Sequence, residues 1–542
     1  MIIEKNLVDW QTKTIFPAKI TVENQYIKAI ERIDKHIDGF VMPGFVDAHV
    51  HIESSLLIPS EFARMAVVHG TVATVSDPHE IANVCGKEGV LYMIENASKV
   101  PFNFCFGAPS CVPATIFETN GASLDAEVVN ELLNHPHIYY LTEMMNYPGV
   151  IYNDEEVHRK IAYAKASNLP IDGHAPSLSG ESLDKYISAG ISTDHECSEL
   201  DEAIEKAKKG MKILIREGSA AKNFDSLIPI IDKFPAQVMF CSDDKHPDSL
   251  EMSHIRDLAQ KALDLGYDFW DIIYAACIHP VLHYQIPSGL LRVGDKADFI
   301  TTDNLQSFSN ICTYINGIKV AEHGQTFIKR IEEKSINNFN TSPKNTADFI
   351  LNIPVESRNA QVIVIHDGQL LTSKENIILP TGVSTFESDI NQDIIKLVVV
   401  NRYSNAKVAM ALVKNSGIKS GAIASSVAHD SHNIVAMGCN DKDICNAVNL
   451  VIKEKGGLAY SNNQIKHILP LPVAGLMNNM DAWEMADAYT AIDELVKTGT
   501  QTTLKAPFMT LSFLALPVIP QLKLTDKGLF DVNTFAYSEL FS

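Results

Sequence analysis

Two histidines spaced one residue apart, His49 and His51, end the apolar run VMPGFVDAHVH and are the first residues that could do chemistry. Neutral imidazole is a common ligand of divalent metal ions. With 19 histidines in 542 residues, a His-x-His pair is expected about once by chance. A second pair does occur, at His135 and His137. The spacing is therefore informative only together with the elements that hold it.

Eight short β-rich runs follow one another between residues 41 and 284, separated by segments of helical periodicity such as LDAEVVNELLNH and DEAIEKAKKG. This alternation predicts repeated βα units and a parallel sheet, and eight units close a (β/α)₈ barrel. The predicted strands are GFVDAHV, GTVATVS, FNFCFGA, IYYLTE, LPIDGH, GISTDH, MKILIRE and AQVMFCSDD. The sequence thus predicts an α/β fold with a central TIM-like barrel.

Polar residues recur at one place in these runs, the carboxyl end of the strand. That end of a (β/α)₈ barrel carries the active site. A single Asp or His there usually caps a helix, but a whole series at equivalent positions is difficult to explain as caps. The series is His49, His51, Asp77, Glu143, His174, His195 and Asp243. His135 and His137 precede a strand, so we place them at the opposite end of the barrel without a function.

The histidines and carboxylates of this series form a nitrogen and oxygen ligand set without cysteine, which suits Zn²⁺, Mn²⁺ or Fe²⁺. Glu143 lies between the two histidine groups and is placed to bridge two ions, which can share one hydroxide. Metal binding lowers the pKa of water from about 15.7 to about 7. Asp243 is placed to bind one ion and to carry a proton to the leaving group. Hydrolysis of an unactivated C–N bond is the natural use.

The rest of the chain predicts two further domains. The β-rich pieces at residues 1–40 and 285–335 flank the barrel, residues 41–284, and are predicted to pair into one small split β-sandwich domain. The polar stretch from Asn337 to Phe349 is predicted to be a linker. Residues 345–542 are predicted to form an additional C-terminal α+β domain, in which the tract PFMTLSFLALPVIP is buried core.

Composition restricts the partners and the compartment. The formal net charge of -21 argues against nucleic acid polymers and anionic membranes, which it would repel. Nine cysteines without a Cys-x-x-Cys motif argue against a disulfide framework and a thiolate zinc site. The N-terminus shows no signal-peptide pattern. We therefore expect a cytoplasmic protein that acts on a small molecule.

Several blocks resemble the bacterial adenine deaminases, in the binuclear-metal branch of the amidohydrolase superfamily, and the similarity runs through nearly the whole chain. The blocks are HVHIESS, SDPHEIANVCG, LTEMMNYPGV, DGHAPSLSG, TDHECSE, REGSAAKN and CSDDKHPD. The resemblance implies hydrolysis of adenine to hypoxanthine and ammonia, in purine salvage, by a metal-bridging hydroxide that attacks C6. It also implies two divalent ions, with Mn²⁺ or Fe²⁺ favoured, and a homo-oligomer.

The resemblance assigns roles residue by residue. Asp77 matches an acid particular to this family, which assists proton transfer or a metal. Glu143 stands where the superfamily often carries a carboxylated lysine. The implied metal ligands are His49, His51, Glu143, His174, His195 and Asp243.

Four residues near the predicted mouth of the barrel are candidates for substrate contact, each with a structural alternative. Glu53 and Ser54 can reach a purine edge, but a helix N-cap by Ser54 or Ser55 fits the sequence equally well. Arg216 and Glu217 end the seventh strand, and an internal ion pair is the competing interpretation.

The sequence also predicts the surroundings of four other polar residues. His429 is a fifth candidate for substrate contact and lies in the turn HDSHN, which is either an ordinary Asx or Ser turn or part of a lid over the barrel. His79 and Glu80 are expected to lie behind the ligands. Asp244 is expected to cap the helix that follows it.

Two other functions stay open at this point. Another binuclear amidohydrolase, acting on a cyclic amide or an N-acetyl amino sugar, would use the same ligands. A catalytically inactive scaffold of the same fold is the more remote alternative, because the ligand set is complete. Cysteine-ligated zinc deaminases are excluded, because their Pro-Cys-x-x-Cys motif is absent.

Overall fold

The computed structural model describes residues 1–219 and 221–542. Its central part contains eight parallel strands, each of which coincides with one of the predicted runs. They are β5 (Phe45–Val50), β6 (Thr71–Ser76), β7 (Asn103–Ala108), β8 (Ile138–Met144), β9 (Ile171–Gly173), β10 (Thr193–Asp194), β11 (Lys212–Arg216) and β12 (Val238–Cys241). The predicted order of the strands is confirmed.

The eight strands close into a barrel. Strands β5 to β9 form one ladder and β10 to β12 a second. Backbone hydrogen bonds join the ladders at both seams, from Ser192 N to Ile171 O and from Asp243 N to His49 O, each at 2.9 Å. Every residue of β5 and β6 is buried, as expected for strands covered on both faces. The prediction of a (β/α)₈ barrel is confirmed.

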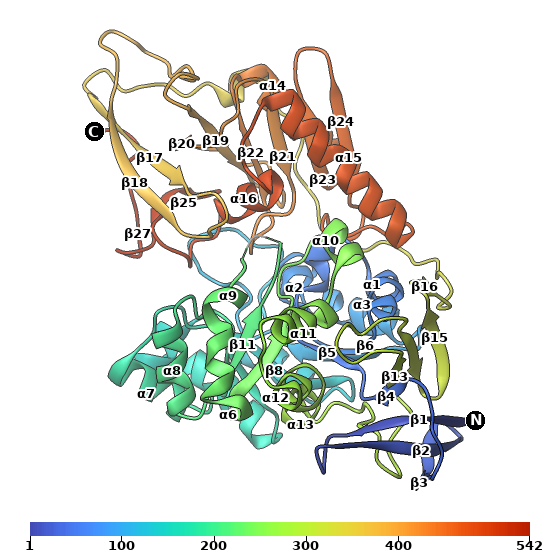
Figure 1. Cartoon of the computed structure of the whole chain (residues 1–542). Coiled ribbons are helices and arrows are strands. Elements are labelled where there is room, and N and C mark those ends of the chain that lie inside the picture. The colour runs from blue at the N-terminus through green and yellow to red at the C-terminus, as the bar shows by residue number, and fades with distance from the viewer. Residues whose placement is uncertain (220) are drawn as a thin grey trace.

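Helices alternate with the strands and cover the barrel (Figure 1). Asp154 caps α6, since its side chain accepts a hydrogen bond from Val157 N. Gly190 and Gly210 end helical segments at positive φ, 101° and 95°, a conformation that suits glycine. The principal helices are α1 (Pro59–Ala66), α2 (His79–Cys85), α3 (Lys87–Ala97), α4 (Ala126–Leu133), α6 (Glu155–Ala166), α7 (Gly180–Ser188), α8 (Leu200–Lys208), α10 (Pro247–Met252), α11 (Ile255–Asp264) and α13 (His279–Tyr284).

Segments before and after the barrel share one sheet of eight strands, in the order β16-β15-β14-β13-β4-β1-β2-β3. The junction is β4, which pairs in parallel with β1 and antiparallel with β13. The strands are β1 (Ile2–Asp9), β2 (Thr14–Glu23), β3 (Tyr26–Arg32), β4 (Phe40–Met42), β13 (Phe299–Thr302), β14 (Cys312–Ile315), β15 (Ile318–Glu322) and β16 (Gln325–Thr326). The exact domain boundaries stay a prediction.

The C-terminal region contains a second eight-stranded sheet, in the order β18-β17-β20-β19-β22-β21-β23-β24. The strands are β17 (Asn359–Ile365), β18 (Thr372–Ile378), β19 (Ile394–Val400), β20 (Ala409–Lys414), β21 (Ala422–Ser425), β22 (Ile434–Gly438), β23 (Gly457–Ser461) and β24 (Lys466–Pro470). Its helices are α14 (Asp441–Glu454), α15 (Ala482–Thr500) and α16 (Pro507–Phe513), and a small sheet holds β25 (Leu522–Thr525), β26 (Gly528–Asp531) and β27 (Ala536–Tyr537).

The C-terminal region stands on the mouth of the barrel, the end where the strands terminate (Figure 1). One hydrophobic core runs through both regions. Asn478 N donates to Leu56 O at 2.8 Å, and Arg64 pairs with Asp481 at 2.7 Å. The tract containing α16 is buried as predicted, but it also faces the site described next. No helix in the described part of the chain is long and apolar enough to span a bilayer.

Candidate metal-dependent active site

The predicted metal ligands meet at the carboxyl ends of the barrel strands, and all are buried. Parallel strands end at one edge of the barrel, so residues distant in the chain become neighbours. Each ligand lies in a strand or follows one by no more than two residues. We call these six residues the ligand cluster: His49, His51, Glu143, His174, His195 and Asp243.

One part of the cluster surrounds His51. Its Nε2 lies 3.2 Å from His49 Nε2 and 3.3 Å from Asp243 Oδ1. Asp243 Oδ1 is also 3.5 Å from His49 Nε2. The other ring nitrogen of His49, Nδ1, is buried without a hydrogen-bond partner. Two ring nitrogens and a carboxylate oxygen that converge in this way are a donor set for a divalent cation.

Glu143 connects this group to a second one. Its Oε2 lies 2.6 Å from His174 Nδ1 and 3.1 Å from His195 Nε2, whereas Oε1 lies 3.5 Å from His51 Nε2. The two oxygens of one carboxylate therefore face separate histidine groups, which is the arrangement of a bridging ligand. Subsets of these residues bring their ligand atoms within 4.8 Å of one another. The cluster fits divalent metal ions.

Both carboxylates of the cluster are held in the ionised form. Burial would raise the pKa of Glu143, but His174 and His195 lower it well below its usual value. Burial would also raise the pKa of Asp243, and Arg216 and the neighbouring histidines lower it well below normal. Both groups are therefore anionic at neutral pH and can bind cations.

Asp77 and His79 lie at the edge of the cluster. His79 Nδ1 is 3.2 Å from Asp77 Oδ1 and 3.5 Å from Glu143 Oε1. Burial opposes the charge on His79, but Asp77 and Glu80 raise its pKa well above the usual value. The sequence placed His79 behind the ligands, whereas its ring lies beside that of His51, with centroids 4.7 Å apart. The difference arises because His79 begins α2 directly after the strand end at Asp77.

Arg216 lies inside the mouth and makes the internal ion pair that was one of its two interpretations. It donates to Asp243 Oδ2 at 2.9 Å and to both oxygens of Glu196. It also lines the cavity above the cluster, so the two interpretations are compatible. Glu196 was not identified from the sequence, although it directly follows His195 in TDHE and could have been found there.

Glu53, Ser54 and Ser55 do not line the cavity. Glu53 Oε1 accepts a hydrogen bond from Ile81 N at 3.1 Å, and burial raises the pKa of Glu53 to about 7. Neither serine caps a helix. Ser54 Oγ donates to Asp244 Oδ1, and Ser55 Oγ donates to Ile52 O at 2.6 Å. The prediction of a serine N-cap is wrong because the segment forms a short 3₁₀ turn, Ile52–Ser55, capped by no side chain.

Two acids near the mouth differ from their expected positions. Glu217 follows β11 but turns outward, with Oε1 4.0 Å from Lys261 Nζ, and it does not line the cavity. Asp244 caps no helix, because α10 begins after His246 without a side-chain cap. Instead Asp244 lines the cavity beside Asp243 and accepts from Ser54 Oγ. Asp243 and Asp244 follow β12, where Asp243 adopts a positive φ of 55°, and both residues line the cavity.

The C-terminal region completes the site through the HDSHN turn. His429 Nδ1 and His432 Nε2 each bond a different oxygen of Glu80, on α2 of the barrel. Burial alone would lower the pKa of His429, but Glu80 raises it to about 9. The His429 ring stacks on Phe513 of α16, with centroids 4.5 Å apart. The turn therefore reaches over the barrel mouth, as the lid interpretation required.

The cavity above the cluster is small, about 30 Å³. Its barrel side includes five residues of the cluster, all but His49, together with Arg216 and Asp244. Its other side is formed by the C-terminal residues Leu370, His429, Asp430, Phe513, Leu516 and Ile519. Asp430 and the apolar residues were not predicted to face the site, because Phe513 ends α16 and the others lie in loops without a periodic pattern.

The second histidine pair behaves as predicted. His135 and His137 lie just before β8, at its amino end, with ring centroids 5.8 Å apart. His137 is exposed. Neither residue contributes to the cavity at the mouth.

Comparisons with known proteins identify the family of this chain. A model described as the amidohydrolase family matches residues 40–320, and one described as the adenine deaminase C-terminal domain matches residues 369–536. The adenine deaminase of Sulfurovum sp. (strain NBC37-1) is 50% identical over 537 residues, 99% of this chain and 99% of its own. That of Borreliella afzelii (strain PKo) is 48% identical over 99% of this chain and 98% of its own.

Among solved structures, the β-aspartyl dipeptidase of Fervidobacterium islandicum AW-1 has 15% identity and a TM-score of 0.46, covering 62% of this chain and 100% of its own. This likeness is too distant to inform the chemistry. The family models and the near full-length relatives, by contrast, match both the barrel and the region that covers it. The chain belongs to the adenine deaminase family of the amidohydrolases.

Proposed function

We propose that this chain hydrolyses adenine to hypoxanthine and ammonia, a step of purine salvage. The observation that carries the proposal is identity of 46 to 50% with proteins named adenine deaminase over nearly the whole chain. That similarity includes the C-terminal region, whose residues close the cavity opposite the ligand cluster. An enzyme for a different substrate would be expected to share the barrel ligands but not this cover.

Two divalent ions are proposed to bind the ligand cluster, Mn²⁺ or Fe²⁺ in preference to Zn²⁺. His49, His51 and Asp243 would hold one ion, and His174 and His195 the other, with Glu143 between them. When bound, such ions lower the pKa of water and polarise the electrophile. The support lies in the facing ring nitrogens and in the unpartnered Nδ1 of His49.

Asp243 is proposed to move the proton. Arg216 occupies Oδ2, which leaves Oδ1 facing the two histidines of the first strand. Oδ1 would accept a proton from a water molecule while the oxygen of that water adds to C6 of adenine. The C6–N bond then breaks as that proton passes to the departing nitrogen. One water is consumed and one ammonia leaves, so the atoms balance.

Asp77 is the proposed second proton carrier. Its Oδ1 faces His79, whereas its Oδ2 is buried without a hydrogen-bond partner. Arg216 is proposed to fix the orientation of Asp243 rather than to read the purine. Glu53 and Glu217 are not part of the proposed substrate site, because neither lines the cavity.

We also propose a cellular compartment and an oligomeric state. A reducing cytoplasm fits the nine cysteines, all of which are free thiols in the structure. A homo-oligomer is expected by analogy with the superfamily, and sedimentation of the purified protein would measure it.

Ammonia release by Mn²⁺-loaded protein tests the function directly. Adenine is expected to be turned over, and adenosine, cytosine, guanine and a cyclic amide to be left unchanged or converted far more slowly. Turnover of the cyclic amide in place of adenine would assign the chain to the alternative amidohydrolase activity. Binding without turnover of any of these compounds would favour the inactive scaffold.

A further inference from the structure

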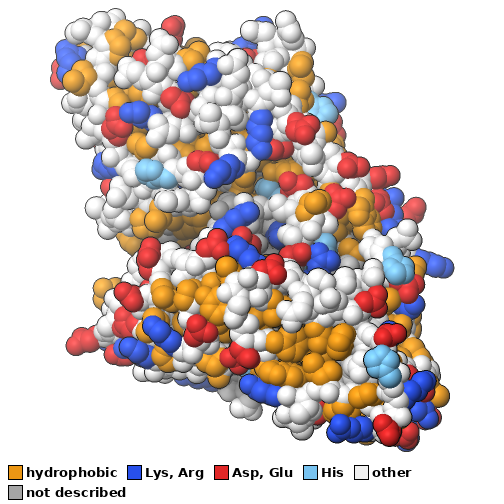
Figure 2. Space-filling model, in the orientation of Figure 1, with side chains coloured by type: hydrophobic (Ala, Val, Ile, Leu, Met, Phe, Trp, Pro, Cys, Tyr) orange, Lys and Arg blue, Asp and Glu red, His pale blue; other side chains and the backbone are white. Residues whose placement is uncertain are grey.

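A second, larger cavity lies beside the cavity of the ligand cluster. It measures about 520 Å³ and is enclosed by α10 of the barrel side and by α15, α16 and the turn after β17 of the C-terminal region. In Figure 2 the seam between the two regions is hollowed, with Lys and Arg side chains at its edge. We call this the outer cavity, and the one above the ligand cluster the inner cavity.

Two of the described residues line both cavities, Leu370 and Phe513. These two residues therefore lie between the outer and the inner space, and we call them the partition. The inner cavity of about 30 Å³ has room for about two water molecules, because a cavity needs about 10 to 15 Å³ to hold one. A bicyclic purine is several times larger, so the partition has to move before a purine can contact the cluster. The outer cavity, in contrast, has the size of a small-molecule site.

Polar atoms without partners gather on the wall of the outer cavity. His246 Nδ1 lies 3.0 Å from Ser54 O, so this nitrogen is the donor, and Nε2 is left as an unpartnered acceptor. His246 is 5% exposed, and burial lowers its pKa, which keeps the ring neutral. Asp248 Oδ1 and Asp493 Oδ1 are also buried without partners.

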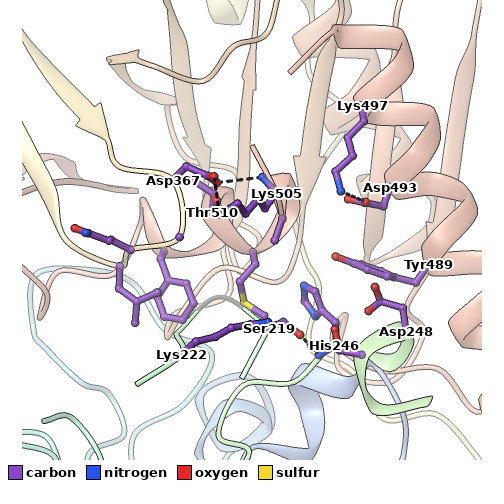
Figure 3. A pocket seen from close by; sticks show the side chains of 17 residues that line it. Ser219, Lys222, His246, Asp248, Asp367, Tyr489, Asp493, Lys497, Lys505 and Thr510 are labelled. Carbon is purple, nitrogen blue, oxygen red and sulfur yellow. Dashed lines mark hydrogen bonds and ion pairs between the residues drawn. The ribbon is translucent and has the colours of Figure 1, made fainter. Parts of the chain in front are cut away.

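An aromatic surface accompanies these acceptors. Tyr489 lies against His246, with ring centroids 4.6 Å apart. Figure 3 shows His246, Tyr489 and Asp248 together on one side of the outer cavity, with Asp367, Lys505 and Thr510 on another. Acceptors beside an aromatic face suit a planar base that carries N–H donors. This is the chemical class of the proposed substrate.

The partition is held from behind by one buried amine. Lys523 Nζ donates to Leu370 O at 2.9 Å and to Phe513 O at 3.0 Å. Lys523 is fully buried, and burial lowers its pKa to about 7. An amine without a carboxylate partner is costly to bury. Its two hydrogen bonds go to the backbone oxygens of the two residues that separate the cavities. The amine therefore fixes the backbone that controls passage from one cavity to the other.

We propose that the outer cavity binds the purine before and after reaction, and that Leu370 and Phe513 form a gate whose closed position Lys523 holds. This inference rests on the proposed function, because it names the route to the same site. His246, Asp248 and Asp493 would accept the N–H groups of the base, and Lys523 would act as a positioning residue.

A third cavity offers a competing route. It measures about 260 Å³ and shares Met145 and His174 with the inner cavity. Its wall contains three prolines, Pro148, Pro176 and Pro520. None of the buried, unpartnered polar atoms found in the described residues belongs to a residue of its wall. The outer cavity is therefore favoured as the purine route.

A matched pair of tryptophan variants separates the two routes. Thr510 lines the outer cavity and Val518 the third cavity, and both are half-buried. Thr510→Trp is expected to weaken adenine binding in equilibrium dialysis, and to lower kcat/KM, by about tenfold or more. Val518→Trp is expected to stay within about twofold of the unsubstituted protein in both. The reverse pattern, or equal effects, would overturn the proposal.

Lys523 variants test the gate. Lys523→Met removes both hydrogen bonds, and kcat per metal-loaded site is expected to fall about tenfold, while Lys523→Arg restores most of it. A purely structural lysine would lower the melting temperature but leave kcat and KM of the folded fraction unchanged. If Lys523→Met does not fold, Leu370→Ala replaces it and is expected to change KM for adenine at least about threefold. An unchanged KM would then reject the gate.

Failure of the proposed function is distinguishable from failure of this inference. If the unsubstituted protein releases no ammonia from adenine, the proposed function fails, and adenine binding to the tryptophan pair still decides the route. If it is active and the two tryptophan variants behave alike, only the outer cavity and its gate are rejected.

Discussion

The two halves of the inner cavity are built in different ways. The barrel half presents imidazoles and carboxylates from strand ends, where the backbone is fixed by the parallel ladders. The C-terminal half presents His429 and Asp430 from a turn and apolar side chains from the end of α16. We therefore expect the chemistry to depend on the half built from strand ends, and access to depend on the half that the C-terminal region supplies.

Replacement of Asp243 is expected to have the largest effect on turnover, and it tests the barrel half of the inner cavity. Asp243→Asn keeps the size of the side chain but removes the proton acceptor beside His49 and His51. Deamination of adenine is expected to fall by about a thousandfold or more, with the melting temperature little changed. Near-normal turnover by this variant would show that the barrel half has been assigned the wrong proton carrier.

Replacement of His429 is expected to have the second-largest effect on turnover, and it tests the C-terminal half of the inner cavity. His429→Ala removes one contact to Glu80 and the stack on Phe513. Turnover is expected to fall by about 10- to 100-fold, less than for Asp243→Asn, because the cover is loosened and the ligands remain. His135→Ala, at the opposite end of the barrel, is the matched control and is expected to leave turnover unchanged. Equal effects of the two variants on turnover would show that the C-terminal cover has no specific role in the reaction.

The pH dependence of stability tests how the cover is held. Burial lowers the pKa of Lys523 to about 7, while an unfolded lysine titrates near about 10.4. Between these values the unfolded chain binds more protons, so the free energy of unfolding rises with pH. Relative to Lys523→Met, the stability of the unsubstituted protein is expected to rise by up to about 1.4 kcal/mol per pH unit from about pH 7 to 10. Urea denaturation at several pH values measures this, and parallel curves would contradict it.

Replacement of Glu217 is expected to have the smallest effect on activity, because this residue follows a barrel strand but lies outside the inner cavity. Its side chain turns toward Lys261 and away from the inner cavity. Glu217→Gln is therefore expected to change kcat/KM for adenine by less than about twofold. A loss of tenfold or more would place Glu217 in the substrate site after all.

The barrel half was largely predictable from the sequence, for a physical reason. A strand that is buried on both faces is a continuous apolar run, so a histidine or carboxylate at its end is visible as an interruption. Parallel strands that close into a barrel must bring those interruptions together. His49, Glu143 and His195 are recognisable in this way from their positions at strand ends alone.

The second half was not predictable in the same way. Phe513 and Leu370 sit in a helix end and a loop, and nothing in their local pattern indicates that they meet above a barrel built from distant residues. The position of Asp244 was also not predictable, because the chain leaves the strand conformation at Asp243, whose φ is 55°, and both residues then line the inner cavity.

Metal titration of metal-free protein tests the central claim most directly. Mn²⁺ is added stepwise while ammonia release from adenine is measured. Activity is expected to be absent at the start, to rise with added metal, and to reach its maximum at about two ions per chain, as a pair of ions sharing Glu143 requires. Full activity in metal-free protein, or no ammonia from adenine at saturating metal, would contradict the account.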